Sequence, residues 1–174
     1  MKPNYLTILI TTLCIFFNAC HNSNTAPQLQ LADSLIDKRA DSALCILEKL
    51  SIEEISNKSA KAMYALLLTE ALDKNFKSHR NDSLILIAVD YYKDNSNNKL
   101  KTKAYYYLGR VYQDNKEYIK ATEAYLTALK TASPNQAPIL QIYNNLALCY
   151  ESQEFYLPAI KLSLIHISEP TRPY

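Results

Sequence analysis

The sequence predicts an all-α fold made of short antiparallel helices. Apolar residues recur at helical spacing from Leu31 onward, polar breaks separate these segments, and the 174-residue chain has one Gly. A β-rich or dinucleotide-binding chain of this length would need several glycines for its turns and phosphate loops. Because 48% of the residues are hydrophobic, the chain has enough apolar side chains to build a core.

Several residues have the positions expected of helix starts. Asp41 precedes SALCILEKL and Asp82 precedes SLILIAVDYY, so each is expected to cap the free N–H groups of a first turn. Ser51 and Glu54 have the spacing of a capping box. Pro138 stands where a first-turn proline is tolerated. The breaks DKNFKSHRN and KDNSNN have the composition of helix-ending loops.

The segment that begins at Thr102 carries the most specific pattern in the chain. An aromatic, Leu-Gly and Tyr are followed by Ala, an aromatic and Ala, at Tyr105, Leu108, Gly109, Tyr112, Ala121, Tyr125 and Ala128. This pattern resembles the tetratricopeptide repeat (TPR), a helical hairpin of about 34 residues. Tyr105, Leu108 and Tyr112 share one helical face. Gly109 and Ala121 are expected to be small because the paired helices cross closely there.

A second unit of this kind follows, with the same interval of twelve between its small positions, at Tyr143, Leu146, Ala147, Tyr150 and Ala159. Upstream, residues 31–100 resemble degenerate TPR-like hairpins, and residues 101–161 resemble two TPR units of which the second is incomplete. The resemblance implies a TPR-like α-solenoid of antiparallel helical hairpins.

The first twenty residues, MKPNYLTILITTLCIFFNAC, resemble an export signal. The apolar run from Tyr5 to Phe17 is shorter than the roughly 20 residues that a membrane-spanning helix needs. Ala19-Cys20 resembles the lipobox of bacterial lipoproteins, although Phe17 replaces the usual Leu. The resemblance implies a lipoprotein signal peptide over residues 1–19 and lipidation of Cys20. The alternative is an ordinary cleaved signal with an incidental Cys.

The residues after Cys20 bear on location. His21 follows Cys20, so the Asp that retains some lipoproteins in the inner membrane is absent. We therefore expect a lipid anchor in the cell envelope, on the periplasmic side of the outer membrane. Residues 20–30 are expected to form a flexible tether.

The last thirteen residues break the repeat pattern. The second unit requires an aromatic at 163 and Ala at 166, but the sequence has Ser163 and His166. LSLIHISEPTR is also identical to one reading frame of a transposon-based sequencing adapter. We therefore interpret residues 162–174 as an artefact and expect the natural protein to be truncated near Lys161. A genuine divergent C-terminus is the alternative.

No catalytic or metal-binding pattern is present. There is no H-E-x-x-H, Gly-rich phosphate loop or EF-hand sequence, and no C-x-x-C pair among the four Cys. Cys45 and Cys149 are expected to be small buried hydrophobic residues rather than a disulfide. A formal net charge of +2 does not favour nucleic acid as a partner. We therefore expect a non-enzymatic chain without cofactor or metal.

The TPR resemblance also implies a peptide-binding groove lined by the first helix of each repeat. The corresponding residues are Lys103, Tyr106, Arg110, Gln113, Gln141, Asn144, Leu148 and Glu151. Lys103 and Arg110 could meet a carboxylate of the peptide. The alternative is an ordinary polar helix face. Tyr106 and Arg110 do not match the Lys and Asn of the family's carboxylate clamp, which argues against binding of chaperone tails.

The leading functional hypothesis is a membrane-anchored scaffold that binds a protein or peptide partner in the periplasm. A second hypothesis is the sensory half of a longer membrane-bound transcriptional regulator. A third is a degradative or glycan-handling enzyme that has lost its catalytic domain.

Overall fold

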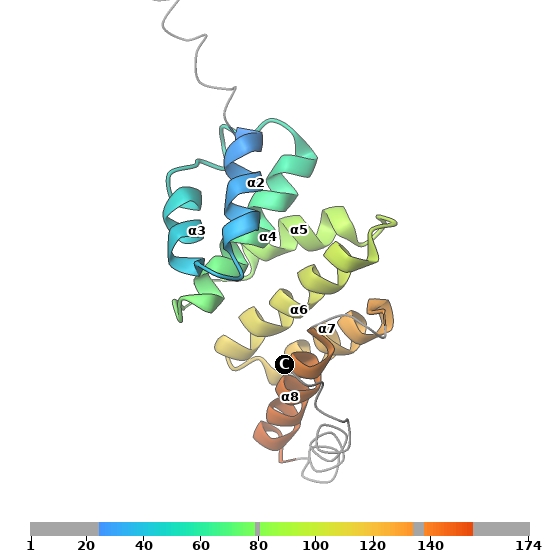
Figure 1. Cartoon of the computed structure of the whole chain (residues 1–174). Helices are drawn as coiled ribbons and strands as arrows, with labels where there is room; N and C mark the ends of the chain where they lie inside the picture. Colours follow the sequence, from blue (N-terminus) through green and yellow to red (C-terminus); the bar gives the residue numbers. More distant parts are fainter. Residues whose placement is uncertain (1–24, 79–80, 134–137, 155–174) are drawn as a thin grey trace, which may run out of the picture.

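A computed structural model of the chain describes residues 25–78, 81–133 and 138–154. These residues form seven α-helices and no strand (Figure 1): α2 Thr25–Leu35, α3 Ala40–Leu47, α4 Lys58–Lys74, α5 Ser83–Tyr92, α6 Asn98–Asp114, α7 Tyr118–Thr131 and α8 Pro138–Ser152. The prediction of an all-α fold is confirmed.

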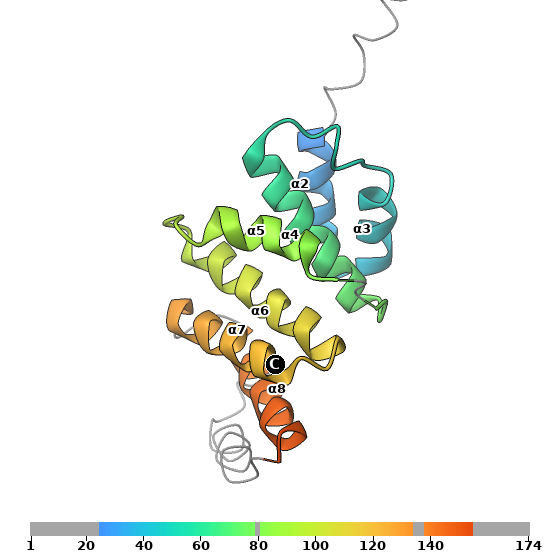
Figure 2. The ribbon, with the colours of Figure 1, turned by 180° about the vertical axis from the view of Figure 1, so that it is seen from behind.

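The helices stack as successive hairpins. Each helix packs against the next one in the chain, and α2, α4, α6 and α8 also contact one another in that order. Figures 1 and 2 show the resulting elongated stack, with α2 and α3 at one end and α8 at the other. Contacts of each hairpin with only the hairpins next to it are the defining property of a solenoid.

Two of the first helices, α4 and α6, share one start signal. α4, α6 and α8 begin at residues 58, 98 and 138, so successive units are 40 residues apart. Asn57 and Asn97 cap α4 and α6, and their side chains accept hydrogen bonds from the N–H groups of Ala60 (3.1 Å) and Leu100 (3.2 Å).

These first helices also share an end signal. Each is followed by a residue in the left-handed region: Phe76 (φ 54°), Lys116 (φ 62°) and Glu154 (φ 63°). The next N–H donates back to a carbonyl in the last turn, from Lys77 to Leu72 at 3.0 Å and from Glu117 to Tyr112 at 2.8 Å. This is the Schellman ending, here without the glycine that most helices use.

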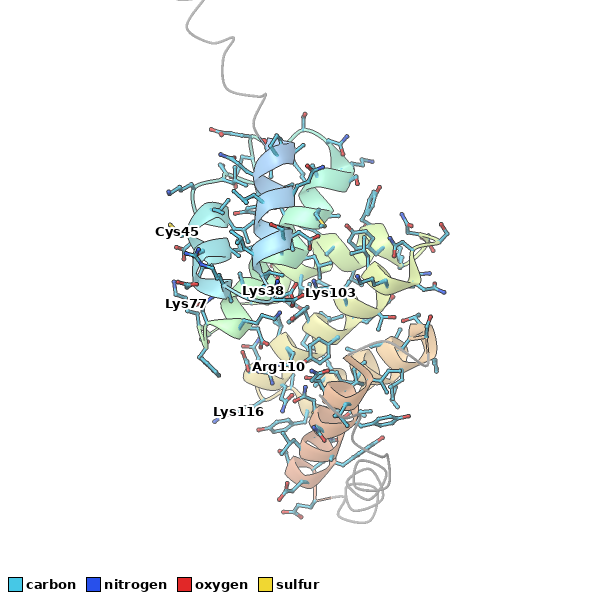
Figure 3. The ribbon with its side chains drawn as sticks, viewed as in Figure 1. Lys38, Cys45, Lys77, Lys103, Arg110 and Lys116 are labelled. Atoms are coloured by element: carbon cyan, nitrogen blue, oxygen red, sulfur yellow. The ribbon has the colours of Figure 1, made fainter. Side chains whose placement is uncertain are left out.

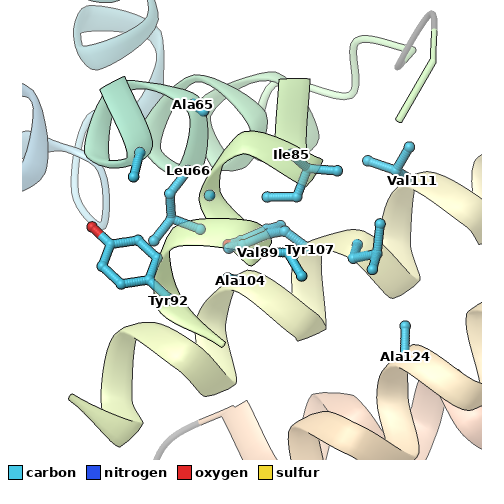
Figure 4. Close-up of a cluster of buried hydrophobic side chains, with 12 residues drawn as sticks. Ala65, Leu66, Ile85, Val89, Tyr92, Ala104, Tyr107, Val111 and Ala124 are labelled. Carbon is cyan, nitrogen blue, oxygen red and sulfur yellow. The ribbon is translucent and has the colours of Figure 1, made fainter. Parts of the chain in front are cut away.

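Three buried clusters lie between the stacked hairpins. One joins α2, α3 and α4, a second joins α4, α5 and α6, and a third joins α7 and α8. Figure 4 shows the second, in which Leu66, Ile85, Val89 and Tyr107 meet between three helices. Each hairpin is thus covered by the next, so no hairpin could bury its apolar face alone.

Gly109 lies at the closest approach of α6 and α7. A Cβ added there would lie 2.8 Å from Cζ of Tyr125 and closer still to Cε1. The Tyr125 ring has no exposed surface, and its hydroxyl donates to Oε1 of Gln113 at 2.7 Å. Ala121 is also completely buried. Gly109 and Ala121 are therefore small because the paired helices cross closely there, as expected. The large residue that Gly109 accommodates is Tyr125.

Two of the expected helix starts are wrong. Asp41 lies inside the first turn of α3, whose N-cap is Arg39, because the helix begins two residues earlier than expected, at Ala40. No helix begins at Ser51, so it forms no capping box with Glu54; its carbonyl instead accepts a turn hydrogen bond from the Glu54 N–H.

The other two start signals are located correctly. Asp82 is the N-cap of α5, but its side chain makes no capping hydrogen bond. The Ser83 N–H instead donates to Oδ1 of Asn81 at 3.2 Å. Pro138 begins α8 as expected.

The expectations for the tether and for Cys45 are also corrected. Helix α2 begins at Thr25, within the range 20–30 assigned to a tether, because Leu29 packs into the first cluster at 4% exposure. Cys149 is buried as predicted, but Cys45 is exposed, because the buried stripe of the short α3 runs through Ala43, Leu44 and Leu47. Both thiols are free.

Gly109→Ala should lower the free energy of unfolding by about 2 kcal/mol, because the new methyl group overpacks the Tyr125 ring. At an unhindered helical site the same change would stabilise by about 1 kcal/mol. Gly109→Leu should be more severe. In a Tyr125→Ala background the added methyl should cost nothing, and an equal cost in both backgrounds, measured by urea denaturation, would refute the contact.

The two described cysteines should differ in reactivity. Burial raises the pKa of the Cys149 thiol to about 11, so at pH 8 little thiolate exists and reagent cannot reach it. Cys45 is exposed. Iodoacetamide should modify Cys45 in the native protein and Cys149 only after denaturation, as read by peptide mass mapping. Equal native rates would contradict the packing of α8.

Candidate functional site

The predicted groove residues of α6 lie along its face toward α4 and α8. Lys103, Tyr106, Arg110 and Gln113 are all half-buried. Figure 3 shows Lys103 and Arg110 on one flank of the stack. Each of the four is held by residues of the same chain, as the following contacts show.

Lys103 is part of a chain of alternating charges. Its Nζ lies 2.5 Å from Oε2 of Glu70, a charge contact outside hydrogen-bond geometry. The other oxygen of Glu70 lies 3.1 Å from Nζ of Lys74, which also donates to Oδ1 of Asp37 at 2.6 Å. Glu70 is only 2% exposed. These ion pairs therefore connect three elements, which are helix α4, helix α6 and the turn that follows α2.

The pKa values of Asp37, Lys74 and Tyr107 are shifted in this group. The hydrogen bond from Lys74 lowers the pKa of Asp37. Burial alone would lower the pKa of Lys74, but Asp37 and Glu70 outweigh it and the net shift is upward. Burial, and then the charge of Glu70, raises the pKa of Tyr107. All the shifts favour the ion pairs and keep Tyr107 neutral.

Arg110 is tied to α4 in the same way. Its Nε donates to Oδ1 of Asp73 at 2.8 Å, and its Nη2 lies 3.9 Å from Oδ1 of Asp114. Burial opposes the charge of Arg110, yet Asp73 raises its pKa overall. Lys103 and Arg110 were expected to meet a partner's carboxylate. In the structure, the carboxylates that they meet are Glu70 and Asp73 of their own chain.

The sequence pattern did not identify Glu70 and Asp73. Counted back from the left-handed residues 76 and 116, Glu70 is equivalent to Arg110 and Asp73 to Gln113. The position of Gly109 is then taken by Thr69, so the Leu-Gly signature is missing from α4. The reversal of charge between Glu70 and Arg110 was the available signal.

Tyr106 and Gln113 connect α6 to its other neighbours. The Tyr106 oxygen accepts from Nδ2 of Asn145 on α8 at 3.4 Å, and burial raises the pKa of Tyr106. Gln113 accepts from Tyr125 on α7 and, at 3.5 Å, from Arg110. The polar side chains of α6 therefore hold neighbouring helices of the solenoid together.

The predicted groove residues of α8 have a different environment. Gln141, Asn144, Leu148 and Glu151 form one exposed stripe, and Leu148 is 49% exposed. Asn145, by contrast, is buried against Tyr106. The groove face thus has an ion-paired part on α4 and α6 and an open part on α8.

Clefts lie beside the helices in the part of the chain that the structure describes. A cleft of about 310 Å³ is lined by Asp73, Phe76, Lys77, Ser78, Arg110 and Asp114. A larger cleft of about 540 Å³ lies between the start of α2 and the start of α4. The smaller cleft is lined mainly by charged side chains, and the larger one by apolar and uncharged polar side chains.

Within residues 25–78, 81–133 and 138–154, no three His, Cys, Asp or Glu side chains gather as a metal site. No helix of this part is both long enough and apolar enough to cross a bilayer. The expected signal peptide, Cys20 and residues 162–174 lie outside the described residues.

Comparison with known proteins supports the fold. No family model and no curated protein matches the sequence. The chain is similar to the crystal structure of the TPR domain of Arabidopsis FLU, at 18% identity and a TM-score of 0.58, over 64% of this chain and 96% of that one. It is also similar to the crystal structure of MamA protein, at 20% identity and a TM-score of 0.55, over 87% of this chain and 80% of that one. At these identities the likeness establishes the fold, a TPR-like α-solenoid.

Glu70→Ala should lower the free energy of unfolding by about 2 kcal/mol, because it removes the buried carboxylate that pairs with two lysines. Lys74 and Lys103 keep 30% and 24% exposure, so water relieves part of the loss. The matched control is Glu48→Ala, whose pair with Lys77 is half exposed on both sides and should cost below about 0.5 kcal/mol. An equal loss of unfolding free energy in the two variants, measured by thermal or urea denaturation, would rule out a structural role for the buried ion pairs of Glu70.

Proposed function

We propose that the protein is a non-catalytic scaffold that binds a protein or peptide partner along the groove face of its first helices. The observation that carries this proposal is the exposed stripe of α8, with Leu148 at its centre. An exposed leucine beside the amide side chains of Gln141 and Asn144 offers a partner both an apolar contact and hydrogen bonds to its backbone.

The ion-paired part of the face supports the same proposal. Because Lys103 and Arg110 are held by Glu70 and Asp73, the face is rigid before any partner arrives. A preorganised surface loses little conformational entropy on binding. The charges of α4 and α6 thus shape the groove, and the side chains of α8 contact the partner.

We propose further that the scaffold is anchored by lipid at Cys20 and faces the periplasm from the outer membrane. The support is the lipobox-like Ala19-Cys20, the apolar run before it, and His21 in place of a retention Asp. A lipid anchor would place the start of α2 close to the membrane surface, since only residues 21–24 separate it from Cys20.

Photo-crosslinking in cells tests the binding face. A photoreactive phenylalanine replaces Leu148 on α8 or, as the control, Leu126 on α7, which is similarly exposed at 40%. A discrete crosslinked partner is expected from position 148 and not from position 126. Leu148→Asp should weaken capture of that partner at least about tenfold, whereas Leu126→Asp should not. Identical crosslinks from both positions would contradict a specific groove.

The anchor has its own test. Intact mass of the mature protein should show acyl groups on an N-terminal Cys20, and Cys20→Ala should move the protein from the membrane fraction to the periplasmic fraction. An unmodified mature N-terminus at another residue would refute lipidation and leave the binding proposal standing.

A further inference from the structure

The charges of the groove face alternate from one first helix to the next. α4 contributes the acids Glu70 and Asp73, and α6 contributes the bases Lys103 and Arg110. Counted back from the left-handed residue after each helix, Glu151 of α8 holds the position that Asp73 holds on α4. The groove face thus changes from acidic on α4 to basic on α6 and back to acidic on α8.

The acidic residues of α4 and α8 differ in what they contact. Lys103 lies 2.5 Å from Glu70. Arg110 donates to Asp73 at 2.8 Å, so α6 neutralises the acids of α4. In Figure 1, α8 lies at the end of the stack, and no described helix lies beyond it. Glu151 is exposed and forms no ion pair with a described residue, so its charge is open to a group from a partner.

The charge at this end of the face is negative. No Lys, Arg or His occurs between residues 138 and 154, whereas this segment contains Glu151 and Glu154, which are both exposed. The end of α6 adds exposed Asp114 and Lys116, whose charges cancel. The last turn of α8 has no basic residue, so the negative end of its helix dipole adds to the two glutamates. The α8 face therefore favours a cation.

The same face of α8 also carries two exposed leucines. Leu140 and Leu148 lie about two turns apart and are 38% and 49% exposed. Asn144 lies between them, and Glu151 follows Leu148 by about one turn, so the four side chains project from one side of the helix. A partner that fits this face supplies apolar groups at the leucines and a positive charge one turn further along.

We propose that the partner of the α8 face is a basic segment, with apolar side chains on Leu140 and Leu148 and a Lys or Arg side chain on Glu151. Its cation does for α8 what Lys103 and Arg110 do for α4. This reverses the expectation from the sequence, in which Lys103 and Arg110 meet a carboxylate of the partner. The inference rests on the proposed function, because it names the chemistry of the partner that binds the same face.

Binding of two labelled synthetic peptides to the purified full-length chain, measured by fluorescence anisotropy, tests the charge of the partner. The peptides share one pattern of leucines and differ only in having Lys or Glu at their polar positions. The Lys peptide should bind at least about tenfold more tightly than the Glu peptide, and added salt should reduce this difference. Equal or tighter binding of the Glu peptide, or no binding of either peptide, would overturn the proposal.

A matched pair of charge reversals tests whether the effect lies on α8. Glu151→Lys should weaken binding of the Lys peptide about tenfold, because it replaces the acid that meets the cation by a like charge. Glu123→Lys, at an exposed position of α7, changes the net charge by the same amount and should weaken binding less than about twofold. Equal losses in the two variants would show that the peptide responds to net charge alone and would contradict the proposed contact.

A third variant separates failure of this proposal from failure of the proposed function. Leu148→Ala removes the apolar contact without changing the charge, so it should also weaken binding of the Lys peptide several-fold. If Leu148→Ala weakens binding of both peptides while Glu151→Lys has no effect, the binding face stands and the basic partner is refuted. If Leu148→Ala leaves the binding of both peptides unchanged, the binding face is refuted as well.

Discussion

The contact between Gly109 and Tyr125 is the constraint on which the rest of the structure depends. Because residue 109 has no side chain, the Tyr125 ring can enter between α6 and α7 and be completely buried. Its hydroxyl reaches Gln113, Gln113 accepts from Arg110, and Arg110 binds Asp73 on the preceding hairpin. The absence of a side chain at residue 109 therefore allows Tyr125 to link two regions. These are the core of the α6–α7 hairpin and the polar face that α6 shares with α4.

The same network changes how the predicted peptide-binding groove is interpreted. A polar first-helix face suggests free charges that await a ligand, but Lys103 and Arg110 already have carboxylate partners of their own chain. Because these pairs are partly or wholly shielded from water, an incoming acidic peptide would have to displace Glu70 or Asp73. The exposed stripe on α8 faces no such competition, and binding there leaves the ion pairs intact.

The sequence predicted the second half of the helical region, from α6 onward, better than the first half. Around Gly109 the small and aromatic positions are dictated by close helix crossing, so the pattern located α6, α7 and α8 correctly. In α4 the equivalent of Gly109 is Thr69, and no periodic signal marked Glu70 or Asp73 as face residues. Helix caps were predicted poorly: neither Asp41 nor Ser51 caps a helix, whereas the side chains of Asn57, Asn81 and Asn97 bind the first turns of α4, α5 and α6. Capping depends on the backbone of a single residue, and composition does not reveal it. The exposure of Cys45 was missed because the direction of a short helix is set by its neighbours.

The central claim is that the Tyr125–Gln113–Arg110–Asp73 network acts as one unit across two hairpins. A double-mutant cycle with Tyr125→Phe and Asp73→Asn, followed by urea denaturation, tests it most directly. Residues in one hydrogen-bond network should show a coupling free energy of about 0.5 kcal/mol or more, although Tyr125 and Asp73 share no direct hydrogen bond. Additive effects, within about 0.3 kcal/mol, would show that the core and the groove face are independent and would contradict the account.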